Sequence, residues 1–199
     1  MGGFVKQAAI LASAGIVVRL IGFAYRLPLT ALIGDEGNGI YGASYNMYLF
    51  FLVVSSAGFP AAISKMVSER TARGAHYNAH EVFRTCLLLV GGLGFAASAT
   101  LALGAGFFAW IINPYDPVTY HAILALAPTV FLVAIMAVFR GYFQGLATTG
   151  PTAVSQLVEQ VFNAVFTVVL AMMFLNITGD IAMGAAGATA GKGVGAFFG

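Results

Sequence analysis

An apolar stretch at residues 8–28 is long enough to cross a lipid bilayer as a helix, yet it carries two arginines, Arg19 and Arg26. Small residues and both arginines recur at alternating steps of four and three, which places them on one helical stripe. An arginine at the centre of a membrane helix costs about 2.5–3.5 kcal/mol on insertion scales. We therefore expect both guanidinium groups to face a water-filled cavity, where fixed positive charge can hold an anion.

The composition sets the class of protein. The chain is 60% hydrophobic and only 8% charged, whereas an ordinary soluble domain is about 25% charged. These values predict an integral membrane protein, and we expect no nucleic-acid partner. Cys86 is the single cysteine, which excludes an internal disulfide and a cysteine metal cluster.

Six segments reach the length of about 20 apolar residues that spans a bilayer, so we predict an all-α integral membrane protein with six transmembrane helices. Glycines recur along the last segment and form a small-residue face that favours close helix packing. The chain stops in apolar sequence, and we expect it to be cut short or to be one half of a larger transporter. The predicted segments are residues 8–31, 40–62, 85–112, 120–141, 152–175 and 181–199, and the glycines are 184, 187, 191, 195 and 199.

The connections between these segments alternate in charge. Lys6 precedes the first segment, and the second connection holds Lys65, Arg70, Arg73 and Arg84, whereas the first and third connections hold neither lysine nor arginine. The positive-inside rule then places the N-terminus in the cytoplasm and requires an even number of crossings. Residues 64–84 are too polar to span, and the i, i+4 spacing of their charges predicts a helix at the cytoplasmic interface.

Three tyrosines share one face of the second segment: Tyr41, Tyr45 and Tyr48. Tyr41 and Tyr45 are interpreted either as interfacial belt residues or as lining residues. Tyr48 lies deeper, where it can offer a hydroxyl and a ring face to a sugar. Gly58 and Pro60 predict a bend near the inner end of the segment.

The fifth segment carries four polar side chains on one broad face: Gln156, Glu159, Asn163 and Thr167. Such residues favour a lining position over lipid contact. Two roles stay open for Glu159: it neutralises an arginine of the first segment, or it binds a coupling proton or sodium ion. The alternative for the group is structural hydrogen bonding between helices.

Lys192 lies near the middle of the sixth segment among glycines that partly match a phosphate-binding loop. The motif fails at residues 186 and 193, and no strand precedes it, so we expect a cavity-facing lysine and no nucleotide. His76, His80 and Glu81 have metal-compatible helical spacing without a further ligand nearby. We therefore expect no metal site and no cofactor.

Five motifs in order resemble the polysaccharide-biosynthesis/stage V sporulation protein B family of flippases, part of the multidrug/oligosaccharidyl-lipid/polysaccharide superfamily. The resemblance implies two six-helix lobes around a central cavity, with residues 1–199 as the N-terminal lobe and the C-terminal lobe absent. It implies that Arg19 and Arg26 line the cavity, with Arg26 the less regular match, and it assigns Lys192 no role. The motifs are RLIGFAYR at 19–26, GDEGNGIY at 34–41, SAGFPAAISK at 56–65, FRGYFQG at 139–145 and PTAVSQLVEQ at 151–160.

The resemblance also implies a polyprenyl-pyrophosphate-linked oligosaccharide as cargo, such as a lipid II-like peptidoglycan precursor or a polysaccharide repeat unit. We predict a multi-pass flippase of the bacterial plasma membrane, working by alternating access with membrane lipids and a second lobe as partners. The expected substrate-binding residues are Arg19, Arg26, Tyr48, Gln156, Asn163 and Lys192, with Glu159 for ion coupling. The alternatives are an ion-coupled multidrug exporter of the same superfamily and a non-transporting fragment. A membrane enzyme is disfavoured because paired catalytic carboxylates are missing from the spans.

Overall fold

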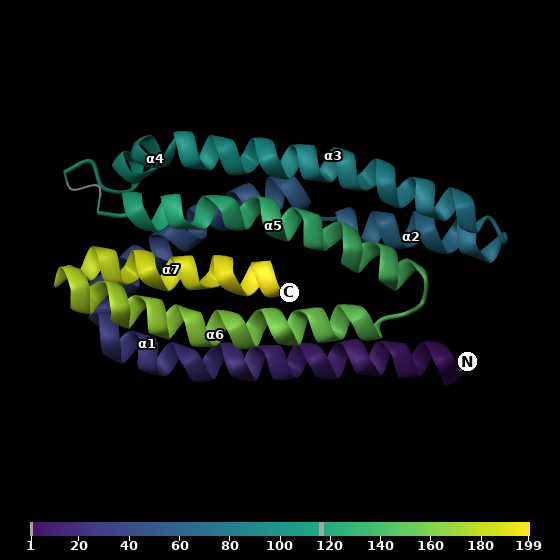
Figure 1. Ribbon diagram of the computed structural model, residues 1–199, viewed down its shortest axis with the longest axis horizontal. Helices are drawn as coiled ribbons and strands as arrows, with labels where there is room; N and C mark the ends of the chain where they lie inside the picture. The colour runs from purple at the N-terminus through teal and green to yellow at the C-terminus, as the bar shows by residue number, and fades with distance from the viewer. Residues whose placement is uncertain (1, 116–117) are drawn as a thin grey trace.

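The computed structural model describes residues 2–115 and 118–199, and within these residues the protein is all-α, with no strand. The long helices run side by side along the length of the molecule (Figure 1). The expected all-α membrane fold is confirmed. The helices are α1 (Gly2–Ser56), α2 (Phe59–Ala72), α3 (His76–Leu103), α4 (Ala105–Ile112), α5 (Tyr120–Gly145), α6 (Gly150–Thr178) and α7 (Ile181–Phe198).

Helix α1 contains a sharp kink at Gly34, where φ is 66° and ψ is −171°. This conformation is essentially restricted to glycine, since a Cβ atom would clash with the neighbouring backbone. Figure 1 shows the chain running from the N-terminus to the far end of the molecule and returning behind the other helices. The loop expected at residues 34–39 is therefore only one residue long, because helix resumes immediately after Gly34.

Helix ends differ from the predicted segments at three places. The second segment is interrupted near its inner end, because α1 ends at Ser56 and α2 begins at Phe59 after Gly58, whose φ is 84°. The bend predicted at Gly58 and Pro60 is confirmed. Residues 64–84 do not form one surface helix, because α2 ends at Ala72 and α3 begins at His76. The third segment is broken at Gly104, where a Cβ would lie 2.8 Å from the carbonyl oxygen of Thr100.

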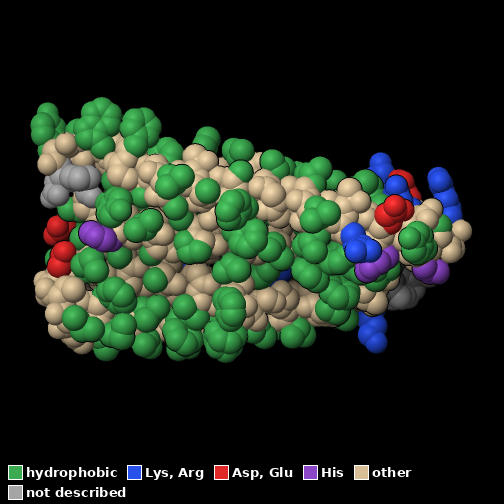
Figure 2. All heavy atoms as spheres, turned by 45° about the horizontal axis from the view of Figure 1, so that its top comes forward, with side chains coloured by type: hydrophobic (Ala, Val, Ile, Leu, Met, Phe, Trp, Pro, Cys, Tyr) green, Lys and Arg blue, Asp and Glu red, His purple; other side chains and the backbone are tan. Residues whose placement is uncertain are grey.

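The surface of the molecule is divided by polarity along its long axis. Figure 2 shows an apolar middle, with lysines, arginines and most histidines gathered at one end together with acidic side chains, and with further acidic side chains at the other end. Four helical stretches are long and apolar enough to cross a membrane: residues 5–72, which include the turn at Gly34, His76–Leu103, Tyr120–Gly145 and Gly150–Thr178. The chain is therefore a multi-pass membrane protein. Helix α7 is not among the stretches that are long and apolar enough to cross a membrane, so the number of six crossings stays a prediction.

Helices α6 and α7 pack closely through glycines, as their spacing predicts. A Cβ atom built on Gly187 would lie 2.4 Å from the carbonyl oxygen of Leu170, and one on Gly191 would lie 2.3 Å from the amide nitrogen of Thr167. Without side chains at these positions the two backbones come into direct contact. This contact fixes Lys192, which follows Gly191, relative to the polar face of α6.

Candidate functional site

Arg19 and Arg26 are exposed on the first half of α1. The buried face of this helix includes Ala14 and Leu29 and lies to one side of the arginine stripe. Between the arginines, Gly22 contacts α6: a Cβ at this position would lie 3.1 Å from Gln160 Nε2. The stripe therefore borders the α1–α6 contact. Among the described residues, no carboxylate forms a salt bridge with either arginine.

The three tyrosines form a stacked ladder on the second half of α1. The ring centroids of Tyr41 and Tyr45 are 6.1 Å apart, and those of Tyr45 and Tyr48 are 5.5 Å apart. Tyr48 is only 2% exposed and belongs to a core shared with α3, α4 and α5. The role in sugar contact predicted for Tyr48 stays a prediction, and in this conformation its ring supports that of Tyr45.

A charged group from another helix lies on this ladder. The Nζ atom of Lys192 lies 4.7 Å from the centre of the Tyr45 ring, in cation–π contact. The fold thus places an ammonium group of α7 beside the row of tyrosines on α1.

Glu159 forms the one ion pair found among the described residues, and its partner is Arg140 of α5. The distance from Arg140 Nη2 to Glu159 Oε2 is 2.6 Å, and Ser155 Oγ accepts a 2.9 Å hydrogen bond from the same nitrogen. The side chains of Arg140 and Glu159 are 17% and 25% exposed. The expectation that Glu159 neutralises an arginine of the first segment is therefore not met here. Its role in ion coupling stays a prediction.

The remaining polar residues of α6 occupy different environments. Gln156 is half-buried. Asn163 is 3% exposed and accepts a 3.0 Å hydrogen bond from Thr167 within α6. A Cβ on Gly195 of α7 would lie 2.7 Å from the Cβ of Asn163, so Asn163 lies in the α6–α7 interface. This position favours the structural interpretation of Asn163 over cavity lining, and its predicted substrate contact is untested.

Arg140 and Ser155 were missed by the sequence reasoning. The sequence analysis gave neither residue a role in the site, and Arg140 lies inside α5. The four-residue spacing of Ser155 and Glu159 places both on one face of α6, but it gives no signal for Arg140 on α5. In the part of the chain that the structure describes, no group of three or more metal-ligating side chains is present.

Comparison with known proteins gives one consistent match. Residues 4–198 match the family described as polysaccharide biosynthesis protein. The chain is 34% identical over 172 residues to stage V sporulation protein B of Bacillus subtilis (strain 168), covering 86% of this chain and 33% of the relative. It is 31% identical over 192 residues to the lipid II flippase MurJ of the same organism, covering 92% and 35%. The chain thus spans about a third of the length of these relatives. No solved structure matches the chain.

Proposed function

The chain belongs to the polysaccharide biosynthesis protein family, and on that premise we propose that it forms the N-terminal six-helix lobe of a flippase. The cargo is a polyprenyl-pyrophosphate-linked oligosaccharide, either a lipid II-like precursor or a polysaccharide repeat unit. The flippase moves this cargo across the bacterial plasma membrane by alternating access. It relocates the lipid without altering it, so the protein is not an enzyme.

One observation carries the proposal: two exposed arginines without a salt-bridge partner among the described residues lie on a helix that is apolar enough to span the membrane. A pyrophosphate cannot cross about 30 Å of hydrocarbon unaided. Guanidinium groups form charge-assisted, bidentate hydrogen bonds to phosphate oxygens, which are stronger than neutral hydrogen bonds. Arg19, assisted by Arg26, therefore holds the pyrophosphate, while the prenyl chain stays in lipid.

The other polar groups act on the sugar and on the transport cycle. Lys192 supplies a third cation beside the tyrosine ladder, and the half-buried Gln156 faces the sugar. Tyr48 and Asn163 are buried in this conformation, so they reach the sugar only when helices within the lobe move apart. Glu159 exchanges its partner Arg140 for a coupling ion during that change. This role is supported by the position of the Arg140–Glu159 pair, which is only partly buried.

A second six-helix lobe completes the cavity. The arginine side of α1 is flanked by exposed apolar side chains, among them Ile16, Leu20 and Phe23, at 61%, 63% and 69% exposure. The second lobe covers the arginine side, and lipid covers the rest. The cytoplasmic position of the N-terminus is supported by the cations gathered at the end of the molecule that holds α2 and the start of α3 (Figure 2).

The test is translocation of the lipid headgroup in vesicles containing a full-length relative with arginine at the positions aligned with Arg19 and Arg73. The substitution aligned with Arg19→Ala removes charged hydrogen bonds worth about 1.5–3 kcal/mol each, so transport should fall by about tenfold or more. The control aligned with Arg73→Ala removes an exposed cation at the C-terminal end of α2 and should leave transport unchanged.

Undiminished transport by the Arg19 variant would remove the arginine pair from the mechanism. A cationic dye added to the same vesicles separates the proposal from a multidrug exporter, because dye competition with the lipid would favour the exporter. Product analysis must recover the lipid chemically unchanged, since a modified lipid would indicate an enzyme.

A further inference from the structure

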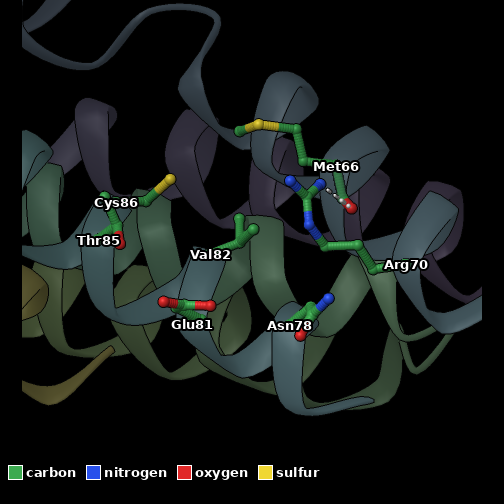
Figure 3. A pocket seen from close by; sticks show the side chains of 7 residues that line it. All are labelled: Met66, Arg70, Asn78, Glu81, Val82, Thr85 and Cys86. Atoms are coloured by element: carbon green, nitrogen blue, oxygen red, sulfur yellow. Dashed lines mark hydrogen bonds between the residues drawn. The ribbon is translucent and has the colours of Figure 1, made fainter. Parts of the chain in front are cut away.

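A polar cleft lies between α2 and the start of α3, away from the tyrosine ladder. It has a volume of about 390 Å³ and is lined by Met66, Arg70, Asn78, Glu81, Val82, Thr85 and Cys86. Figure 3 shows the Arg70 side chain reaching over the cleft from α2, with the side chains of α3 on the facing wall. The cleft therefore places a guanidinium and a carboxylate around one hollow.

These polar groups are available to a ligand. Arg70 Nη1 donates a 3.0 Å hydrogen bond to the carbonyl oxygen of Met66, which leaves four of the five guanidinium N–H donors without a hydrogen-bond partner among the described residues. Within the described residues, Glu81 forms no salt bridge, even though a cation lines the same cleft. A salt bridge between Arg70 and Glu81 would have closed the hollow. Instead the two charges face it separately.

The cleft lies at the polar end of α3, next to its apolar part. Its α3 residues occupy two helical turns, from Asn78 to Cys86, directly before an apolar run. In that run Leu88 is 80% exposed and Leu89 is 54% exposed. Charged side chains at this end of the molecule give way to the apolar middle seen in Figure 2. A molecule in the cleft would thus have its polar part between two charges and an apolar surface beside it.

We propose that this cleft binds the headgroup of an amine-bearing zwitterionic phospholipid, phosphatidylethanolamine. Its phosphate accepts hydrogen bonds from Arg70, its primary ammonium donates to Glu81, and its acyl chains lie against the exposed Leu89, which follows the cleft residues on α3. This site is separate from the cargo site and does not depend on the proposed transport function.

Charge complementarity selects this lipid over the other common headgroups. An anionic phosphatidylglycerol gains Arg70 but gives Glu81 no cation. Phosphatidylcholine carries a quaternary ammonium that has no N–H to donate to the Glu81 carboxylate. A further cation, Arg84, lines a separate hollow on the other side of Glu81, so the phosphate in the cleft is assigned to Arg70 alone.

The test uses native mass spectrometry of the purified chain in detergent, with measured amounts of phosphatidylethanolamine, phosphatidylglycerol or phosphatidylcholine added. The wild type should bind phosphatidylethanolamine about tenfold more tightly than phosphatidylcholine, from one additional charged hydrogen bond. The variant Glu81→Gln should lose this preference. The variant Arg70→Gln should lose about tenfold in affinity for every phospholipid, since all of them share the phosphate.

Two substitutions serve as matched controls: Glu69→Gln on α2, and Arg73→Gln at the residue that directly follows α2. Both residues are exposed, and neither lines the cleft, so these variants should retain the preference for phosphatidylethanolamine over phosphatidylcholine. Equal binding of the three lipids by the wild type would overturn the proposal, and so would a preference for phosphatidylglycerol. The proposal would also be overturned if Glu69→Gln and Glu81→Gln lost the preference for phosphatidylethanolamine to the same extent, because the effect would then come from net charge. If Arg70→Gln does not fold, Glu81→Gln decides the question, because Glu81 is exposed.

Discussion

The contact between α6 and α7 allows a sharp test at Gly191. A Cβ built on Gly191 would lie 2.3 Å from the amide nitrogen of Thr167, 2.4 Å from its Cα and 2.5 Å from the carbonyl carbon of Phe166. All three atoms belong to the backbone of α6, so no side-chain rotation relieves the clash. The variant Gly191→Ala must therefore push the two helices apart.

The magnitude follows from the size of that displacement. Restoring an ordinary contact requires a shift of about 1 Å, and a gap of that size forfeits about a quarter to a half of the dispersion energy of the affected contacts. Overpacking typically costs about 1–3 kcal/mol, and we expect the upper end because backbone is involved. The higher helix propensity of alanine returns at most about 1 kcal/mol. The net loss is about 2 kcal/mol, or about 4–8 °C in Tm for a chain of this size.

The assay is thermal unfolding in detergent, followed by circular dichroism. The matched control is Gly184→Ala on the same helix, because a Cβ there meets Leu175 at 3.4 Å, an ordinary contact. Its melting temperature should stay within about 2 °C of the wild type. If Gly191→Ala and Gly184→Ala have the same melting temperature, the direct backbone contact between α6 and α7 does not exist as described.

Two further predictions concern the ion pair and the kink. The variant Arg140→Gln leaves the Glu159 carboxylate without its partner. In a fully buried pair this change lowers the free energy of unfolding by about 3–5 kcal/mol. Because both side chains are partly exposed here, we expect a loss of about 1–2 kcal/mol. Unfolding measurements should show the double variant with Glu159→Gln to be more stable than Arg140→Gln alone, and strict additivity would contradict the pairing. The variant Gly34→Ala should lose about 1–3 kcal/mol from backbone strain alone, since a Cβ there meets no atom within 4 Å beyond its two neighbours in the chain. Gly39→Ala, equally open and without a positive φ, should lose none, and equal melting of the two variants would contradict the kink.

The sequence predicted most of the helices because a bilayer imposes a simple rule on the chain. Each crossing needs about 20 apolar residues, and such runs are visible without knowledge of any contact. The glycine spacing in the last segment also predicted a close contact, since a missing side chain leaves room in any packing arrangement. Helix ends were predicted less well, because the break at Gly104 and the turn at Gly34 depend on single backbone conformations.

The candidate site was predicted only in part. The arginine stripe of α1 was visible in the sequence because charge is costly in an apolar helix. The partner of Glu159 was not visible, because Arg140 lies 19 residues away on another helix. Lys192 was expected to face a cavity, and the structure adds its contact with the Tyr45 ring.

The sequence by itself determined that this chain is a membrane protein, which segments are helical and where its arginines and lysines fall along them. These properties follow from each segment's own preference for lipid or water, which is local. Only the tertiary structure decided that Glu159 pairs with Arg140, that Tyr48 is enclosed and that Arg70 and Glu81 share a cleft. Those outcomes depend on distances between helices, and helix packing sets those distances through contacts between residues far apart in the chain.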